Sequence, residues 1–171
     1  DQLAGALARA EAVDGVVTLG IPPTRPETGY GYIAVGQPAS DAPPDVLTGE
    51  AFVEKPDRDR AEQYVAGGRH LWNSGIFVWS AAAFAREAGA HVPELVVRMQ
   101  PVADALGTEQ FTAALATAYA DCPAESFDYA VMEHLPAFEV MRARFDWSDL
   151  GSWSAWGDLA PELAAGGRGI A

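Results

Sequence analysis

The chain has 171 residues, of which 49% are hydrophobic, so it is long enough and apolar enough to bury the core of one globular domain. Its formal net charge of −13 and its pI near 4.4 disfavour nucleic acid as a partner, because the field of the protein repels a phosphate backbone. No apolar run approaches the ~18–20 residues that cross a bilayer, and the single cysteine, Cys122, excludes an internal disulfide framework and a zinc cluster built on cysteines.

The first residues, DQLAGALARAEAVDG, lack the basic region and the continuous apolar region of a secretory signal. We therefore expect a cytoplasmic protein that meets no membrane, and one unpaired cysteine is compatible with a reducing compartment. The sequence does not begin with methionine. Together with the motifs below, this predicts a piece cut from a longer chain.

The hydrophobic pattern predicts alternating helices and strands. Short runs rich in β-branched residues predict buried strands, and apolar residues at helical spacing predict amphipathic helices. The predicted strands cover residues 15–21, 32–36, 47–56, 70–81 and 138–150. The predicted helices cover residues 2–12, 57–68, 81–90, 93–106, 108–120 and 125–135, and a last one begins at residue 152. This alternation favours one α/β domain with a mixed sheet, on which the helix-rich residues 81–135 pack as an insertion.

Lys55, in the motif FVEKP, is the only lysine of the chain, whereas every other basic side chain that is always charged is an arginine. Lysine is a compact point charge on a flexible stem, which suits contact with a single phosphate oxygen. The neighbouring Glu54 could accept hydrogen bonds from vicinal hydroxyls, so the pair is typical of a grip on a sugar phosphate. The plain alternative for Lys55 is the end of a strand that reaches solvent.

The motif ETGYGYI places Tyr30 between Gly29 and Gly31. Two glycines allow the backbone to approach a ligand closely and to offer amide donors, while the tyrosine ring packs alongside. A structural turn is the alternative interpretation of the same residues.

The motif WNSGIF carries Asn73 and Gly75. The amide of Asn73 can both donate to and accept from a sugar hydroxyl, and Gly75 would keep the wall of a site thin. The alternative is a β-bulge, in which asparagine and glycine serve the backbone alone.

The motif FDWSDLGSW places Asp149 between a predicted strand and a predicted helix. A carboxylate is a hard oxygen ligand suited to Mg²⁺, which commonly takes one or two carboxylates together with substrate phosphates. Asp149 could equally cap the helix that begins at Ser152. The three histidines show no metal-binding spacing, and Trp72, Trp79 and Trp153 lie in apolar strings that predict core packing.

In combination these segments are more specific than any one of them. The motifs GIPPTRPETGYGYI, FVEKP, WNSGIFVW, ESFDYAVMEH and WSDLGSW, in this order, resemble the mannose-1-phosphate guanylyltransferases, which are sugar-1-phosphate nucleotidylyltransferases. The resemblance runs from about residue 15 to residue 157. It implies a doubly wound, Rossmann-like nucleotidyltransferase fold (the fold of nucleotide-diphospho-sugar transferases), with a mixed sheet flanked by helices.

The resemblance also implies an activity. Members of the family condense mannose 1-phosphate with GTP, giving GDP-mannose and pyrophosphate, with Mg²⁺ as cofactor. Lys55 and Asp149 are then the catalytic residues, Lys55 on the sugar phosphate and Asp149 on the metal. The implied substrate-binding residues are Tyr30, Gly31, Glu54, Lys55, Asn73 and Gly75. The resemblance allows a homodimer, and it leaves the roles of Arg25, Glu27 and Asp128 open.

One departure from the family is large. The Gly-rich loop that cradles the nucleotide triphosphate is absent, as is the aspartate that pairs with the Asp149 equivalent around the metal. We therefore expect a partial nucleotidyltransferase domain over residues 1–171, the sugar-phosphate-binding half without its N-terminal nucleotide-binding half, inactive by itself. The alternatives are another sugar-1-phosphate nucleotidylyltransferase, a non-catalytic sugar-phosphate or nucleotide-sugar sensor, and a carbohydrate-binding protein built on tryptophans.

Overall fold

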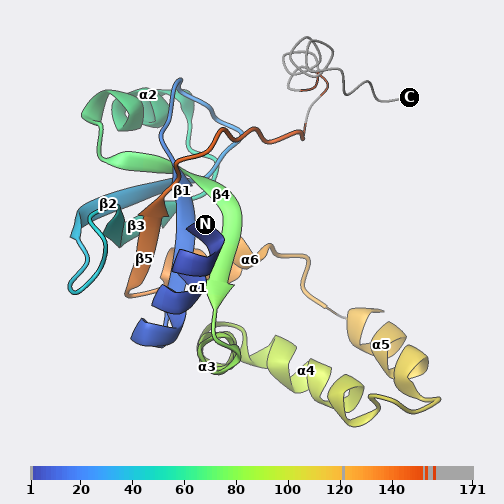
Figure 1. Cartoon of the computed structure of the whole chain (residues 1–171). Coiled ribbons are helices and arrows are strands. Elements are labelled where there is room, and N and C mark those ends of the chain that lie inside the picture. Colours follow the sequence, from blue (N-terminus) through green and yellow to red (C-terminus); the bar gives the residue numbers. More distant parts are fainter. Residues whose placement is uncertain (1, 121, 152, 154–155, 157–171) are drawn as a thin grey trace, which may run out of the picture.

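The computed structural model describes residues 2–120, 122–151, 153 and 156 (Figure 1). The strands are β1 (Val16–Ile21), β2 (Tyr32–Pro38), β3 (Val46–Val53), β4 (His70–Trp79) and β5 (Phe138–Arg142). The helices are α1 (Gln2–Val13), α2 (Arg58–Gly67), α3 (Ala81–His91), α4 (Pro93–Asp104), α5 (Phe111–Ala120) and α6 (Phe127–Ala130), with a 3₁₀ turn η1 (Met132–His134). Strands and helices are thus interleaved over the first half of the chain, with β1, β2 and β3 following one another between α1 and α2.

The five strands close into a barrel in the order β1-β4-β2-β3-β5. The β1–β5 pair is parallel, whereas the other neighbouring pairs are antiparallel, so the sheet is mixed as predicted. Closure of the sheet is a finding that the sequence pattern does not contain. It arises because β3 pairs with β2 along one edge and with β5 along the other, which leaves neither edge of the ribbon open.

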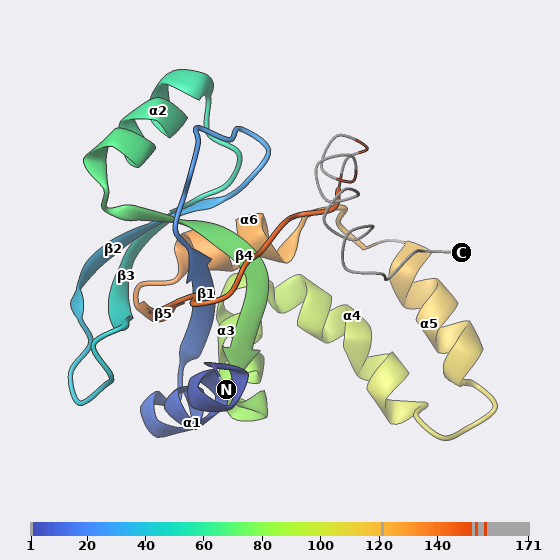
Figure 2. The same cartoon turned by 45° about the horizontal axis from the view of Figure 1, so that its top comes forward.

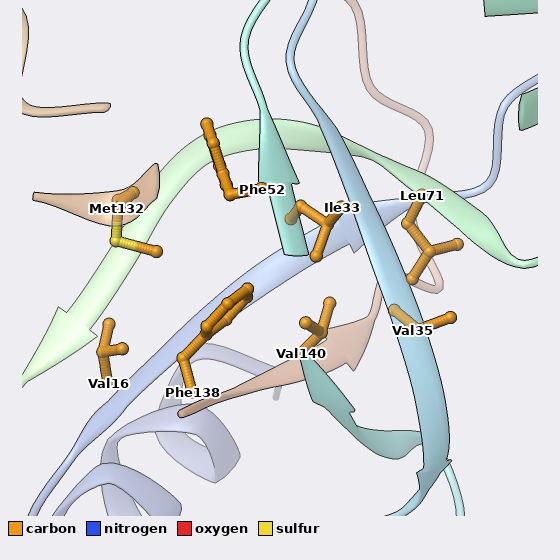
Figure 3. Close-up of a cluster of buried hydrophobic side chains, with 8 residues drawn as sticks. All are labelled: Val16, Ile33, Val35, Phe52, Leu71, Met132, Phe138 and Val140. Atoms are coloured by element: carbon orange, nitrogen blue, oxygen red, sulfur yellow. The ribbon is translucent and has the colours of Figure 1, made fainter. Parts of the chain in front are cut away.

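The inside of the barrel is a continuous apolar core (Figure 3). Every strand and the η1 turn contribute to it, through Val16, Ile33, Val35, Phe52, Leu71, Met132, Phe138 and Val140. Two glycines mark where the filling is tightest. A Cβ on Gly20 would lie 2.6 Å from Leu71 Cδ1, and a Cβ on Gly49 would overlap the ring of Phe138. The core therefore requires residues without side chains at these two positions.

Helix α1 packs on the outside of the barrel through Ala6 and Ala10. An ion pair fixes its position: Arg9 Nε lies 2.7 Å from Glu139 Oε2, and the two side chains are only 14% and 15% exposed. Two further Arg9 bonds go to the carbonyls of Ser40 and Asp41. Hydrogen bonding to Glu139 raises the pKa of Arg9 above its ordinary value. One guanidinium thus joins α1, β5 and the turn between β2 and β3.

The segment 81–135 touches the barrel at its two ends. Helix α3 packs beside β4, and η1 packs beside β3. Between them, α4 and α5 form a pair that extends away from the barrel, as two views of the molecule show (Figures 1 and 2). In the part of the chain that the structure describes, no helix is both long and apolar enough to cross a membrane.

Several predicted elements are a few residues shorter than expected, and two are less than half as long. The strand predicted over residues 138–150 ends at Arg142, because its partners run out there: Arg142 lies opposite Gly20 near the end of β1, and Met141 lies opposite the first residue of β3. The helix predicted over residues 125–135 breaks at Val131, which allows Val131 and Met132 to be buried side by side.

The expected core role of Trp153 is wrong. Its side chain is 90% exposed, because the chain has left the barrel and residues 148–151 before it are exposed as well. Trp72 is buried as predicted, and Trp79 packs partly buried against the barrel core. The helix predicted from residue 152 falls almost wholly outside the described residues.

Replacing Glu139 with alanine should lower the free energy of unfolding by at least about 1.5 kcal/mol, because a charged hydrogen-bonded partner of a mostly buried guanidinium is lost. The measurement is urea denaturation followed by circular dichroism. Glu62→Ala is the matched control, since the Arg58–Glu62 pair is exposed and should change stability by less than about 0.5 kcal/mol. Equal effects of the two substitutions would contradict a special role for the Arg9–Glu139 pair.

Candidate functional site

One polar pocket of about 280 Å³ gathers the residues that the sequence motifs single out. Its walls come from the loop before β2, the corner after β3, the middle of β4, helix α6 and the segment after β5. The lining residues are Gly29, Tyr30, Gly31, Glu54, Lys55, Asn73, Ser74, Gly75, Asp128, Trp147 and Asp149. The structure therefore brings together all seven predicted site residues, although they are spread over 120 positions of the sequence, from 30 to 149.

A second hollow is larger and chemically different. It measures about 840 Å³ and lies between α3, α4, α5 and the segment before α6, where mostly apolar side chains such as Phe84, Val96 and Met99 line it. It offers no convergent set of charged groups. The smaller pocket is therefore the candidate for a reaction on a polar substrate.

The corner after β3 holds the charged pair of the pocket. Lys55 Nζ lies 3.1 Å from Glu54 Oε1, with Lys55 57% exposed and Glu54 only 11% exposed. The hydrogen bond to Glu54 raises the pKa of Lys55 above its ordinary value, and the charge of that carboxylate adds to the effect. Lys55 thus reaches solvent, as the plain alternative holds, and it lines the pocket as well.

Gly31 lies where three strands meet at the pocket. A Cβ on this residue would lie 2.5 Å from Glu54 Oε2 and 3.2 Å from the Cβ of Asn73, so a side chain here would displace both neighbours. The Gly31 carbonyl accepts a hydrogen bond from the Asn73 N–H at 2.8 Å. The close approach that the G-Y-G motif predicts is therefore made by the protein's own Glu54 carboxylate.

Tyr30 is held between two tryptophans. Its ring meets Trp72 and Trp147 edge-on, with centroids 5.2 Å and 5.3 Å away. Partial burial raises the pKa of the Tyr30 hydroxyl above its ordinary value. The ring therefore forms a rigid apolar wall beside the charged groups of the pocket.

Strand β4 bulges where it carries Asn73. Thr18 pairs with Phe77 and Gly20 pairs with Asn73. An advance of two residues along β1 therefore corresponds to four residues along β4. Gly75 takes a positive φ of 74° within the bulge, and its N–H donates to Asn73 Oδ1 at 3.0 Å. The bulge interpretation is confirmed, and the bulge also brings Asn73, Ser74 and Gly75 to the pocket wall.

Two acidic residues of the pocket have internal partners. Asn73 Nδ2 donates to Asp128 Oδ1 at 3.0 Å, which fixes the orientation of the Asn73 amide. The Gly151 N–H donates to Asp149 Oδ1 at 3.1 Å, which makes a local turn; Leu150 and Gly151 lie in no helix, so this bond does not cap one. Among the described residues, no group of three or more His, Cys, Asp or Glu side chains could hold a metal ion.

The sequence matches one known protein family along nearly its whole length. The match, to the family described as Nucleotidyl transferase, covers residues 1–166. The chain belongs to the nucleotidyl transferase family. Among its curated relatives, a mannose-1-phosphate guanylyltransferase of Klebsiella pneumoniae is 40% identical over 148 residues, which are 86% of this chain and 31% of the relative. A mannose-1-phosphate guanylyltransferase of Escherichia coli is 40% identical over 152 residues, 88% of this chain and 32% of the relative.

A solved structure agrees with the sequence match. A protein of Thermus thermophilus, described as a mannose-1-phosphate geranyltransferase, superposes on this chain with a TM-score of 0.72 and 37% identity, over 90% of this chain and 42% of that chain. The resemblance predicted from the motifs is confirmed by these relatives. The chain spans about a third of the length of the curated relatives that it matches.

The sequence motifs did not single out every residue of the pocket. Ser74 and Trp147 line it, and so does Asp128, whose role the sequence leaves open. Trp147 stands two residues before Asp149 in the motif WSDLGSW, so the motif itself contained the signal. Arg25 and Glu27 support the neighbouring loop: the Arg25 guanidinium lies 5.6 Å from the Trp72 ring centroid, and its Nε donates to Glu27 Oε2 at 3.2 Å.

Gly31→Ala should destabilise the fold by about 1–3 kcal/mol, because the new methyl group enters space that Glu54 and Asn73 occupy. Gly29→Ala is the matched control, since a Cβ there meets nothing closer than Glu27 Oε1 at 3.6 Å. Urea denaturation of both variants provides the measurement. A Gly31→Ala protein as stable as the Gly29→Ala protein would show that the Glu54 corner moves freely.

Proposed function

We propose that the chain forms the mannose 1-phosphate side of a site that transfers GMP from GTP to mannose 1-phosphate, giving GDP-mannose and pyrophosphate. The observation that carries this proposal is the convergence of Glu54, Lys55, Asn73 and Asp149 on one pocket. Two curated relatives of 40% identity, both mannose-1-phosphate guanylyltransferases, support it.

The sugar is assigned to the inner part of the pocket. Glu54 is largely buried, so its carboxylate can accept hydrogen bonds from two neighbouring hydroxyls with little competition from water. The Gly31 backbone and the half-buried Asn73 lie against it. The Tyr30 ring supplies an apolar wall for the face of a sugar. These groups together favour a polyhydroxylated ring over a flat base.

The phosphate is assigned to the Lys55 side, where the charge balance matters. Among the residues that line the pocket, Glu54, Asp128 and Asp149 are carboxylates and Lys55 is the cation. An anionic phosphate therefore needs additional positive charge, as expected in a protein of net charge −13. The donor set fits Mg²⁺, because Asp149 supplies a hard carboxylate and substrate phosphates commonly complete the coordination of this ion.

The chemistry follows from this placement. A phosphate oxygen of mannose 1-phosphate attacks the α-phosphorus of GTP, the new P–O bond forms, and the bond to the β-phosphate oxygen breaks so that pyrophosphate leaves. Mg²⁺, when bound, would neutralise charge on the phosphates. The chain's own contribution is to hold the sugar through Glu54 and Asn73 and to aim the phosphate through Lys55, since positioning provides much of the rate in phosphoryl chemistry. The cytoplasmic location and the homodimer stay predictions.

Binding of mannose 1-phosphate by the chain, measured by isothermal titration calorimetry with Mg²⁺ present, tests the proposal. Glu54→Gln should weaken the affinity about ten- to a hundredfold, because a charge-assisted hydrogen bond contributes about 1.5–3 kcal/mol. Glu50→Gln is the matched control, since Glu50 lies four residues earlier, on β3, in an exposed pair with Arg69. Equal binding of glucose 1-phosphate would point to another sugar, and binding of free mannose alone would contradict the assignment of Lys55 to phosphate.

Asp149→Asn separates a metal role from a role in the local turn with Gly151. Asparagine can still accept the Gly151 N–H, so the stability should stay within about 0.5 kcal/mol of the wild type. The wild-type affinity for mannose 1-phosphate should rise at least about tenfold on adding Mg²⁺, and the variant should lose this gain. Without Mg²⁺ the variant should bind the phosphate more tightly than the wild type, since one repelling charge is gone.

Asp146→Asn is the control for Asp149→Asn, because it removes the same charge from an exposed position three residues earlier. It should leave the Mg²⁺ gain in place. An unchanged Mg²⁺ response in the Asp149→Asn protein would assign Asp149 to the turn alone.

A further inference from the structure

The backbone at Lys55 is unusual for its sequence. Lys55 has a φ of 46°, in the left-handed region that residues with side chains seldom adopt, at a cost of about 1–2 kcal/mol. It also precedes Pro56, and a residue before proline prefers extended backbone. The conformation that sets the direction of the Lys55 side chain must therefore be held by surrounding contacts.

A long-range hydrogen bond holds the backbone of Glu54, the residue just before Lys55. The Glu54 N–H donates to Glu133 Oε1 at 2.9 Å, across 79 positions of the sequence. Glu133 itself does not line the pocket and is exposed. Glu133 belongs to the sequence motif ESFDYAVMEH.

The η1 turn holds Glu133 in place. Val131 and Met132, directly before it, are each 1% exposed, and Met132 packs in the same core cluster as Phe52 of β3 (Figure 3). The turn and the end of β3 are therefore one packed unit, from which the Glu133 carboxylate reaches the Glu54 backbone. Asp128, five residues earlier, bonds the Asn73 amide from the same short segment.

We propose that Glu133 is a positioning residue of the sugar-phosphate pocket, which fixes the Glu54 backbone and so keeps Lys55 in its left-handed conformation. This inference rests on the proposed function and deepens it. It also gives the end of the helical segment 81–135 a role in the site. Two carboxylates of this segment bond to the pocket: Asp128 accepts from the Asn73 amide, and Glu133 accepts from the Glu54 N–H.

The effect of removing Glu133 has a sign that distinguishes positioning from simple charge. Loss of a nearby negative charge alone should tighten the binding of an anionic phosphate. Loss of positioning should weaken it. Glu133→Ala removes both the charge and the hydrogen bond, whereas Glu133→Gln removes the charge and keeps an oxygen that can accept the Glu54 N–H.

The experiment measures the affinity of the chain for mannose 1-phosphate with Mg²⁺ by titration calorimetry, and the amide hydrogen exchange of Glu54 by NMR. Glu133→Ala should weaken the affinity about tenfold and speed exchange at Glu54 about tenfold. Glu133→Gln should stay within about threefold of the wild type in both. Glu125→Ala is the control: its side chain makes no hydrogen bond or ion pair within the described residues, so it should change neither quantity.

The outcomes are distinct. Weaker binding in Glu133→Ala, restored in Glu133→Gln, supports positioning, provided that circular dichroism and the urea midpoint show both variants folded. Wild-type binding together with an unchanged or tighter affinity in Glu133→Ala overturns the positioning role and leaves the proposed function standing. A wild-type chain that binds no sugar phosphate overturns the proposed function and the positioning role with it.

Discussion

The meeting of three strands at Gly31 is the constraint on which the pocket depends. The carbonyl of Gly31 accepts the Asn73 N–H, and the Glu54 carboxylate lies where a Gly31 side chain would begin. Because this one residue has no side chain, the start of β2, the end of β3 and the bulged part of β4 bring an amide and a carboxylate into the same small volume. The barrel supplies the rigidity, since the strands that carry these groups are bonded along both edges.

The charges of the pocket set a second condition. Three carboxylates and one ammonium line it, in a protein that is acidic overall. Such a site attracts no phosphate by its own field, so affinity for an anion has to come from local geometry and from a metal ion. Lys55 provides a point charge at the solvent side of the pocket. It is paired with the less exposed Glu54, whose carboxylate can accept hydrogen bonds from hydroxyl groups.

The helical segment 81–135 has two regions with different relations to the site. The paired helices α4 and α5 extend away from the barrel (Figure 1). They border a large hollow that is lined mostly by apolar side chains, unlike the polar pocket. The last residues of the segment return to β3 and β4, where Asp128 and Glu133 bond the two corners that carry Asn73 and Glu54. The middle of this segment therefore extends away from the barrel, whereas its last residues form hydrogen bonds to the pocket.

The sequence by itself determined the local features of this protein. Periodicity and turn residues placed the strands and helices, because those signals act over a few residues. The motifs around Tyr30, Glu54, Asn73 and Asp149 pointed to the family and to the residues that share a pocket. The Asn73 bulge could be stated as an alternative, because asparagine and glycine are typical of it.

Only the tertiary structure decided how these pieces meet. Strand patterns say which face is buried and do not say which strand is the neighbour, so the closed order β1-β4-β2-β3-β5 could not be read from them. The left-handed backbone of Lys55 is not contained in any local pattern. Nor is the bond from the Glu54 N–H to Glu133, because these two residues lie 79 positions apart. Trp153 looked like core from its apolar neighbours, yet it is exposed, because burial depends on what the folded chain places against a side chain.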